Sequence, residues 1–340
     1  MAHKTLFLTE RGTRHQRDAL LAAPPELEVA ILRQPDAKLL HEYLVDAEFL
    51  ISERVGVIDA EILASAPQLK MIERLGSMTD DIDLEAAKTA GVAVCYWPQR
   101  GVILVAEHLI MQMLGLAKRL REVEAIAVEA GDWGESRRTD EDTFAYNWSG
   151  RAGIGGILGA SVGILGFGEI GAELSRRLTG WGCTVQYHRR RRLGRSSEEA
   201  LGILYAERDA LFEKSDFVVN LLPYFQETDL SVGVREFSRM KPGAFFVSCG
   251  SGSVVDEAAL ADAVRSGQLG GAALDTYEWE PIRPDNPLRL LALEVPQWNV
   301  LLTPHTAAGA APAGVTVTRS GEYEPILRYL RAEPIPNRLV

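Results

Sequence analysis

Cysteine is scarce in this chain of 340 residues, which contains only Cys95, Cys183 and Cys249 at wide and irregular spacing. Three cysteines without close pairs do not supply a disulfide framework or the paired ligands of a zinc site, so we expect no metal centre. Free thiols fit a reducing compartment, and we expect a cytoplasmic protein.

Positive charge and long apolar runs are also scarce. The chain carries 36 Lys and Arg against 47 Asp and Glu, a net charge of −11, which argues against a nucleic-acid partner because a phosphate backbone needs a basic face. The N-terminal MAHKTLFLTERGTRHQ is too short in apolar residues for a signal peptide, and we expect no stretch that approaches the ~18 apolar residues of a membrane span.

What the chain does contain is a regular alternation of short apolar strands with helical patterns, beginning KTLFLT, HQRDALLAA, LEVAILR. This alternation predicts an α/β fold with doubly wound parallel sheets. A chain of 340 residues exceeds the usual size of one core, so we expect two domains. The apolar stretch 101–131 predicts one long bridging helix, and the polar stretch after it predicts a surface loop.

The clearest motif is SVGILGFGEIG at 161–171, followed by the helix-forming AELSRRL. Gly166 permits a tight turn, Gly168 lets the backbone approach a pyrophosphate, and Gly171 lets helix pack on strand. The helix N-terminus offers unpaired N–H groups to the phosphates. The motif predicts a dinucleotide held by Gly166, Phe167, Gly168, Glu169, Ile170 and Gly171.

The next strand, TVQYH, lacks the acidic residue that would bind an adenosine ribose 2′-hydroxyl about 20 residues further on. The strand ends at His188 and four arginines follow it. His188, Arg189 and Arg190 therefore stand where the acidic residue would be. A guanidinium suits a 2′-phosphate, which favours NADP(H) over NAD(H), although most basic runs are merely solvated.

Ligands of such sheets bind beyond the carboxyl ends of the strands. His305 follows the apolar run VLL and a proline, so we expect it at such a strand end. An imidazole at that place can transfer a proton at neutral pH. Pairing with Glu280 would raise the pKa of His305. Cys249 has no second histidine placed to activate it, so we expect a packed residue rather than a nucleophile. The strand-end residues expected at the cofactor are Leu222, Pro223, Cys249, Gly250 and Asp275.

Several stretches of the chain resemble the D-isomer-specific 2-hydroxyacid dehydrogenase family: VGILGFGEIG, LLPYFQETDL, MKPGAFFVSCGSGSVVDEAALADAVRSGQLGGAALDTYEWEP and NVLLTPH. GSMTDDIDLEAAKTAGV and VAEHLIMQMLGLAKR extend the match, which runs in the same order from about Leu69 to Gly309. Such collinearity is far more specific than any single motif.

The resemblance implies two Rossmann-like domains: a discontinuous substrate domain at 1–102 and 306–340, and a dinucleotide-binding domain at 103–305 inserted into it. It also implies a homodimer, with the helix near Val105 to Glu129 helping to form the interface. The implied substrate is a small carbonyl or hydroxy compound, with hydride passing between nicotinamide C4 and substrate C2.

The resemblance also implies roles for individual residues. His305 would be the acid or base for the C2 oxygen, supported by Glu280, and Asp275 would face the nicotinamide carboxamide. The loop at Ser77 and Met78 would offer N–H groups to the substrate carboxylate. Pro223, Thr228 and the backbone at Gly250 would line the cofactor.

One departure from the family concerns its third catalytic residue, an arginine that binds the substrate carboxylate; Ser251 stands at that position. A charge-assisted hydrogen bond is worth roughly 1.5 to 3 kcal/mol, so serine should not replace arginine unaided. Another cation such as Arg74 or Arg100 could reach in, the substrate could lack a carboxylate there, or catalysis could be weak or lost. Met78 replaces a usual glycine and favours a larger or more apolar substrate than glyoxylate.

Two hypotheses follow. The first is an NADPH-dependent reductase of a 2-keto acid or related carbonyl compound, with His305 as proton donor, Glu280 sustaining it and Ser251 orienting the substrate. The second is a catalytically silent protein that binds NADP(H) and senses it through its assembly, and its only support is the missing arginine.

Overall fold

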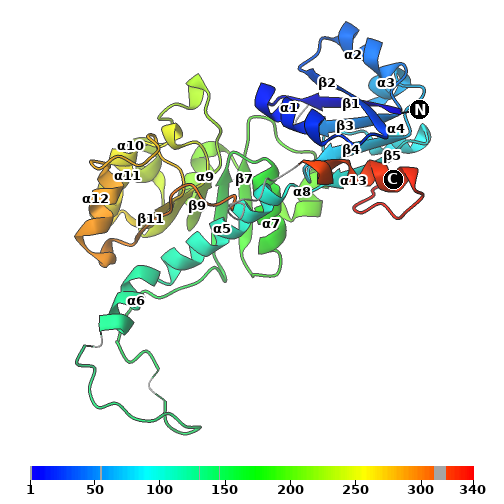
Figure 1. The fold of residues 1–340 in the computed structure, drawn as a ribbon. Coiled ribbons are helices and arrows are strands. Elements are labelled where there is room, and N and C mark those ends of the chain that lie inside the picture. The colour runs from blue at the N-terminus through cyan, green and yellow to red at the C-terminus, as the bar shows by residue number, and fades with distance from the viewer. Residues whose placement is uncertain (1, 54–55, 130, 145, 310–318) are drawn as a thin grey trace. The chain divides into compact units, whose positions relative to one another are not determined.

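The computed structural model describes residues 2–53, 56–129, 131–144, 146–309 and 319–340. The chain divides into two compact units, Met1–Arg100 with Ala310–Val340 and Gly101–Gly309 (Figure 1). The sequence predicts these two domain boundaries after residues 102 and 305, whereas the observed units change after Arg100 and Gly309. Each unit holds one parallel sheet, so the predicted α/β class with two Rossmann-like sheets is confirmed.

Unit 1 is a five-stranded sheet in the order β2-β1-β3-β4-β5, with every pair parallel. Alternate residues of β1 enter two hydrophobic clusters, one containing Leu6 and Leu8 and the other Phe7, so both faces of the sheet are covered. Aspartates begin several helices; the side chain of Asp83 accepts from Ala86 N at 2.9 Å. The elements are β1 (His3–Thr9), α1 (Thr13–Ala22), β2 (Leu27–Arg33), α2 (Ala37–Leu44), β3 (Phe49–Glu53), α3 (Ala60–Ala64), β4 (Met71–Leu75), α4 (Leu84–Thr89), β5 (Ala93–Trp97), the 3₁₀ turn η4 (Ser320–Tyr323) and α13 (Glu324–Leu330).

Unit 2 is a seven-stranded parallel sheet in the order β12-β11-β10-β9-β6-β7-β8. The strand order reverses at the β6/β9 pair, the switch point where doubly wound sheets bind ligands. The elements are α5 (Arg100–Ala117), α6 (Leu120–Glu129), β6 (Ser161–Leu165), α7 (Glu169–Leu178), β7 (Thr184–His188), α8 (Arg195–Leu201), β8 (Ile203–Tyr205), α9 (Arg208–Lys214), β9 (Phe217–Asn220), η1 (Gln226–Thr228), α10 (Val234–Arg239), β10 (Ala244–Ser248), η2 (Gly252–Val254), α11 (Glu257–Arg265), β11 (Leu269–Leu274), α12 (Pro287–Glu294), η3 (Pro296–Trp298) and β12 (Val300–Leu302).

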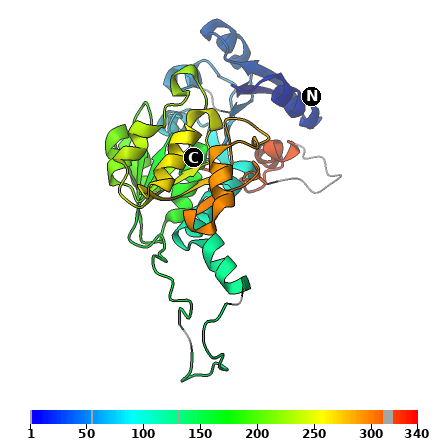
Figure 2. The same ribbon diagram turned by 90° about the vertical axis from the view of Figure 1, so that its left-hand side faces the viewer.

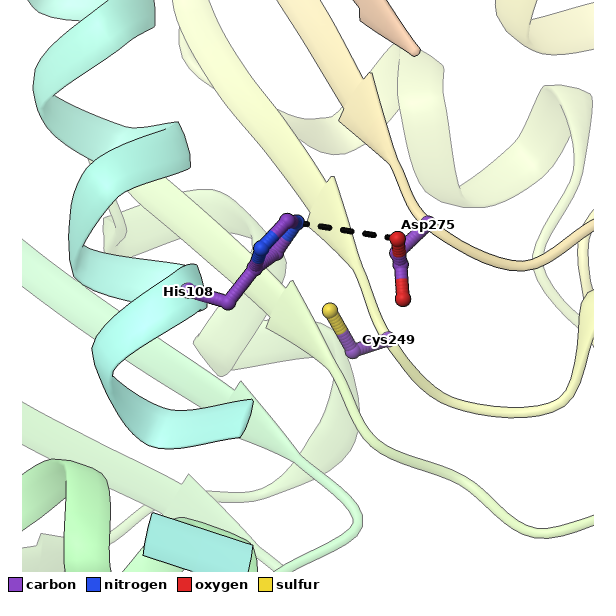
Figure 3. Close-up of side chains that lie close together, drawn as sticks. All are labelled: His108, Cys249 and Asp275. Carbon is purple, nitrogen blue, oxygen red and sulfur yellow. Dashed lines mark ion pairs between the residues drawn. The ribbon is translucent and has the colours of Figure 1, made fainter. Parts of the chain in front are cut away.

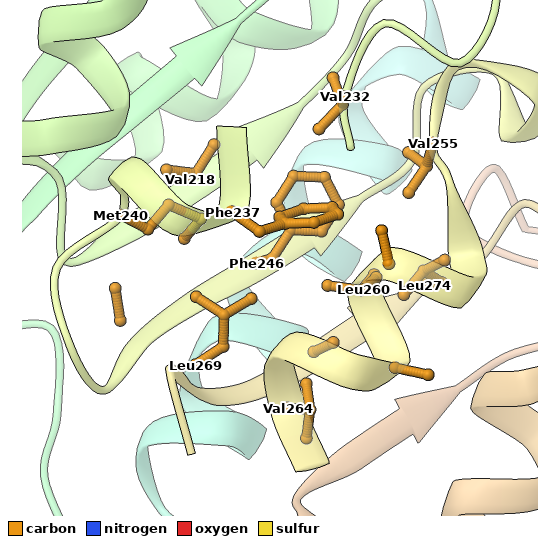
Figure 4. Packing of buried hydrophobic residues seen from close by; sticks show 14 of the residues in the cluster. Val218, Val232, Phe237, Met240, Phe246, Val255, Leu260, Val264, Leu269 and Leu274 are labelled. Atoms are coloured by element: carbon orange, nitrogen blue, oxygen red, sulfur yellow. The ribbon is translucent and has the colours of Figure 1, made fainter. Parts of the chain in front are cut away.

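The largest core cluster of unit 2 lies where α10 and α11 pack on the sheet. Figure 4 shows Phe237 of α10 beside Phe246 of β10, and their rings meet edge to face with centroids 5.2 Å apart. Leu260 and Val264 of α11 join the same cluster. Burial of these side chains against β9, β10 and β11 fixes the strand ends that carry the candidate site.

The single long helix predicted at 101–131 is wrong, because the structure has two helices, α5 and α6. Arg119 between them has φ +51°, a left-handed conformation that ends the first helix, and its Nε donates to Glu122 Oε2 at 2.6 Å. The described residues after α6 form an irregular segment that extends away from the sheet of unit 2 in both views (Figures 1 and 2).

Helix α5 is, by length and composition, apolar enough to cross a membrane, which the sequence reasoning did not expect of any stretch. Core helices of soluble proteins meet the same criterion. Val105, Leu109, Met113 and Leu116 are all buried in unit 2. We therefore interpret α5 as a core helix.

Candidate active site

The glycine turn after β6 has the geometry that a dinucleotide cradle requires. Gly166 has φ +86°, and a Cβ there would approach Leu222 N to 2.7 Å, so no other residue fits. A Cβ on Gly168, the N-cap of α7, would meet nothing within 4 Å, which leaves open space at the helix N-terminus. A Cβ on Gly171 would press on the Phe167 ring at 2.9 Å. The cradle therefore fits a pyrophosphate.

Two arginines that follow β7 have different surroundings: Arg192 pairs with a carboxylate, and Arg190 lies over an aromatic ring. Gly166 N donates to His188 O at 3.0 Å, so the end of β7 lies beside the glycine turn. Arg192 makes a bidentate pair with Glu198, with both hydrogen bonds at 2.8 Å, and is thereby a structural residue. The Arg190 guanidinium lies over the Phe225 ring, 5.4 Å from its centroid, and the residue is exposed.

The segment 249–252 is held tightly against the neighbouring strand ends. Ser251 N donates to Leu222 O at 2.9 Å, and a Cβ on Gly250 would approach Leu222 O to 2.8 Å. A Cβ on Gly252 would overlap Tyr277 backbone at 1.9 Å. Ser251 is thus fixed between two obligatory glycines, half-buried at the β10 end of the sheet.

The turn that follows β9 places two further predicted residues together. Thr228 Oγ1 donates to Pro223 O at 2.9 Å and accepts from Phe225 N at 2.7 Å. This side chain closes the turn that contains Pro223.

His305 and Glu280 are in direct contact, as the sequence reasoning required. The distance between His305 Nδ1 and Glu280 Oε2 is 2.6 Å, and Glu280 Oε1 accepts from Tyr277 N at 3.1 Å. Because the carboxylate occupies Nδ1, the imidazole Nε2 is the atom left for a substrate. The His305 side chain is 60% exposed, so a substrate can reach it.

Asp275 anchors the loop that carries His305. Its Oδ1 accepts from Thr303 Oγ1 at 2.6 Å and from Thr306 N at 2.9 Å, and its Oδ2 accepts from Ala307 N at 2.8 Å. These bonds bracket His305, which has φ +54° and whose N donates to Thr303 O at 3.0 Å. Asp275 is only 1% exposed, so the geometry gives it a positioning function that sequence reasoning missed.

His108 of α5 is a second residue that sequence reasoning missed. Its Nε2 lies 3.0 Å from Thr303 Oγ1 and 3.7 Å from Asp275 Oδ1. Burial lowers the pKa of His108, and the Asp275 charge only partly opposes this. Nothing in VAEHLIMQM marks this histidine, because its partners lie 195 and 167 residues away in the sequence and only the fold brings them together.

Cys249 is half-buried and its Sγ lies 3.7 Å from Gln112 Oε1. Burial, followed by the Asp275 charge, raises the pKa of its thiol. A protonated, packed thiol agrees with the expectation that Cys249 is not a nucleophile.

The predicted substrate residues Ser77, Met78 and Arg74 belong to unit 1. Gly76, with φ +128°, starts their loop and its N donates to Trp97 O at 2.9 Å. Ser77 is buried and Met78 half-buried. The Arg74 side chain is 4% exposed and forms an ion pair with Asp81, so this cation already has a structural partner. Arg100, the other cation considered, is exposed.

Comparison with known proteins identifies the family. The model for "D-isomer specific 2-hydroxyacid dehydrogenase, NAD binding domain" matches residues 110–307. The chain is 32% identical over 306 residues to a glyoxylate reductase of Korarchaeum cryptofilum, covering 89% of this chain and 86% of that protein. It is 32% identical over 260 residues to a D-3-phosphoglycerate dehydrogenase of Archaeoglobus fulgidus, covering 76% of this chain but 45% of the relative.

Among solved structures, the PH0520 protein from Pyrococcus horikoshii is similar over 100% of this chain and 95% of its own, with a TM-score of 0.55 and 27% identity. The sequence matches and this structural similarity cover both units. The chain therefore belongs to the D-isomer specific 2-hydroxyacid dehydrogenases, oxidoreductases that transfer hydride between a nicotinamide dinucleotide and a 2-hydroxy or 2-keto acid.

Proposed function

We propose that this chain is an NADPH-dependent 2-keto acid reductase in which His305 protonates the C2 oxygen of the substrate. The observation that carries this proposal is the 2.6 Å contact between His305 Nδ1 and Glu280 Oε2. A carboxylate on Nδ1 fixes the orientation of the ring and leaves Nε2 directed at the substrate, which is the geometry that a general acid needs. Unit 2 would be the cofactor domain and unit 1 the substrate domain.

The cofactor, when bound, supplies the hydride at its nicotinamide. Gly166 and Gly168 would accommodate the pyrophosphate, with the α7 N–H groups facing it. Leu222, Pro223 and Gly250 would lie along the nicotinamide half. Asp275 would act mainly by holding the His305 loop, because its oxygens accept three hydrogen bonds from Thr303, Thr306 and Ala307.

The choice of NADPH is supported by the end of β7. His188 is followed there by Arg189 and Arg190, and no carboxylate stands where it would repel a 2′-phosphate. Arg190 stacks on Phe225, which holds a planar donor group at the exposed rim. We assign the 2′-phosphate to Arg189 and Arg190, and exclude Arg192 because Glu198 already binds it.

Ser251 would orient the substrate through its hydroxyl in place of the family's arginine. The pairing of Arg74 with Asp81 argues against Arg74 as the replacement cation. A neutral hydroxyl binds a carboxylate weakly, so the preferred substrate would draw more of its affinity from apolar contact than glyoxylate does. We assign such contact to Met78, which follows Ser77 in the same loop of unit 1.

We also propose a homodimer in a cytoplasmic setting. α5, α12 and the segment after α6 expose large apolar side chains, among them Met111, Leu293, Trp133 and Trp148. Met111 and Leu293 line a groove of about 450 Å³ in unit 2. A second copy would cover the groove that Met111 and Leu293 line, since oligomer interfaces bury apolar surface of this kind.

The decisive test is the loss of NADPH absorbance with purified protein and a panel of 2-keto acids, aldehydes and ketones, repeated with NADH. We expect turnover with NADPH and a 2-keto acid, reduced about 10²- to 10⁴-fold in His305→Ala. Unchanged turnover in His305→Ala would refute the mechanism. Tight NADPH binding without turnover of any compound would instead support a cofactor-sensing protein, which no described feature of the structure otherwise favours.

A further inference from the structure

Three potential metal ligands from distant parts of the chain converge beside the His305 loop. His108 comes from α5, Cys249 from the segment after β10 and Asp275 from the end of β11 (Figure 3). A ring nitrogen of His108, Cys249 Sγ and a carboxylate oxygen of Asp275 all lie within 4.8 Å of one another. The sequence predicted no metal centre because its cysteines are unpaired, but a mixed His/Cys/Asp set needs only one thiol.

The spacing of these atoms is close to that of a tetrahedral zinc site. Bond lengths of about 2.0 to 2.3 Å to O, N and S place the ligand atoms about 3.3 to 3.6 Å apart. His108 Nε2 and Asp275 Oδ1 are 3.7 Å apart, and the other separations stay within 4.8 Å. The 4.8 Å limit exceeds the tetrahedral separation of about 3.6 Å by about 1.2 Å, which is the approach of the side chains that the ion requires.

The surroundings supply charge balance and a further oxygen donor. A divalent cation with one thiolate, one carboxylate and one neutral imidazole is neutral overall, which suits the buried position of Asp275. Gln112 is fully buried, its Nε2 has no hydrogen-bond partner, and its Oε1 lies 3.7 Å from Cys249 Sγ. The Gln112 carbonyl oxygen is therefore an oxygen donor beside the thiol, and we take it as the candidate fourth ligand.

We propose that His108, Cys249 and Asp275 form a binding site for a thiophilic divalent cation, Zn²⁺ or its analogue Cd²⁺, and that this ion and the nicotinamide cofactor exclude one another. The ion displaces the thiol proton of Cys249 to solvent and takes the lone pair of His108 Nε2, whose proton moves to Nδ1. The exclusion rests on the proposed function, because the sequence places Cys249 and Asp275 among the residues expected at the cofactor.

This site implies that the enzyme is inhibited by zinc until a cofactor or a chelator competes for the same residues. The coordination takes over an oxygen of Asp275, the residue that holds the loop of His305. Occupation by the ion therefore affects both the cofactor pocket and the catalytic loop.

The test is titration of the full-length, cofactor-free protein with CdCl₂, followed by the ultraviolet charge-transfer absorption of a sulfur–cadmium bond. We expect a band that saturates at one Cd²⁺ per chain, and a Zn²⁺ titration that removes it. Cys249→Ser should abolish the band, and the matched control Cys183→Ser, which alters a half-buried thiol elsewhere in unit 2, should keep it. His108→Gln should weaken binding at least about tenfold. The absence of a band, or a band that persists in Cys249→Ser, would overturn the site.

A second arm separates the site from the proposed function. Saturating NADPH should raise the apparent dissociation constant for Cd²⁺ at least tenfold, and an unchanged constant would overturn the mutual exclusion. A protein that binds Cd²⁺ through Cys249 but shows no NADPH fluorescence change would refute the cofactor assignment while the cation site stands. Circular dichroism of Cys249→Ser and His108→Gln checks that each variant is folded.

Discussion

Glu73 should make the stability of unit 1 fall as the pH rises. It lies on β4 with no exposed surface, and neither carboxylate oxygen has a hydrogen-bond partner. Burial, with a smaller contribution from the charge of Glu322, raises its pKa well above the usual 4.5. The folded chain therefore holds this proton at pH values where the unfolded chain has lost it.

The magnitude follows from proton linkage. Between the unfolded and folded pKa the native state binds one more proton, so the free energy of unfolding decreases by about 1.36 kcal/mol for each pH unit. From pH 5.5 to 7.5 this amounts to about 2.7 kcal/mol if Glu73 stays protonated throughout. The stabilisation is complete below the unfolded pKa and is lost upward through the folded one.

The substitution that isolates this effect is Glu73→Gln, which keeps the shape and removes the titration. Equilibrium urea unfolding, followed by far-ultraviolet circular dichroism at half-unit steps of pH, gives the difference in stability between variant and wild type. We expect the advantage of Glu73→Gln to grow from pH 5.5 to 7.5, by up to about 2.7 kcal/mol. Glu322, whose pKa burial also raises, titrates in both proteins and largely cancels.

The matched control is Glu53→Gln on the neighbouring strand β3. Burial opposes ionisation of Glu53, but Arg11, Arg319, Thr9 and Gln99 together outweigh it and lower its pKa below 4.5. Glu53 is therefore ionised in both states above pH 5.5, and Glu53→Gln should destabilise by an amount that does not vary from pH 5.5 to 7.5. A flat difference for Glu73→Gln as well would refute the reasoning, since it would mean that Glu73 titrates alike in folded and unfolded chains.

Three predictions concern the active site. Glu280→Gln should reduce kcat/KM about 10- to 150-fold and leave NADPH affinity unchanged, because it removes a charge-assisted hydrogen bond to His305 worth about 1.5 to 3 kcal/mol. Steady-state rates measure the first effect and cofactor fluorescence the second. A wild-type value of kcat/KM would contradict the prediction. Arg190→Ala should weaken NADPH at least about tenfold with little effect on NADH, whereas equal losses would remove Arg190 from the 2′-phosphate. Ser251→Arg should lower KM for a 2-keto acid about 10- to 150-fold, and a higher KM would show that the site is built for a substrate without that carboxylate.

Local sequence was sufficient for the features that are set within a few residues. The glycines of 166–171 form a turn whose geometry depends on nearest neighbours, and the structure gives Gly166 the positive φ that the motif requires. The alternation of apolar strands with helical patterns likewise predicted parallel sheets, because each strand had to be buried on both faces. His305 and Glu280 were paired correctly because both follow strand ends of one sheet.

Tertiary contacts explain what the sequence did not reveal. The three-residue strand β8 was missed because Ile203–Tyr205 is too short to show a period, and only its pairing with β7 defines it. The break between α5 and α6 was missed because arginine is a good helix former. Arginine is common inside helices, so its identity gave no sign of the break. The Arg119 side chain pairs with Glu122, which also pairs with Arg151, and these contacts exist only in the folded chain.

The run of four arginines shows the same limit at the level of function. Composition alone gave these residues one meaning, a basic patch suited to a phosphate. In the fold, Arg192 donates to the carboxylate of Glu198, which also accepts from Tyr187 OH at 2.7 Å. Arg192 therefore stabilises the connection between β7 and α8.

Asp275 shows why the catalytic loop depends on residues that no motif marks. The loop after β12 places His305 at φ +54°, a conformation that costs energy for a residue with a Cβ and persists only where the surroundings impose it. Two backbone N–H groups after His305 and the hydroxyl of Thr303 before it all donate to Asp275. His108 then donates to the same hydroxyl, because the hydrogen of Thr303 is already directed to Asp275. The position of His305, the proposed proton donor, therefore depends on a helix nearly 200 residues earlier in the chain, and a substitution at His108 should alter the His305 loop.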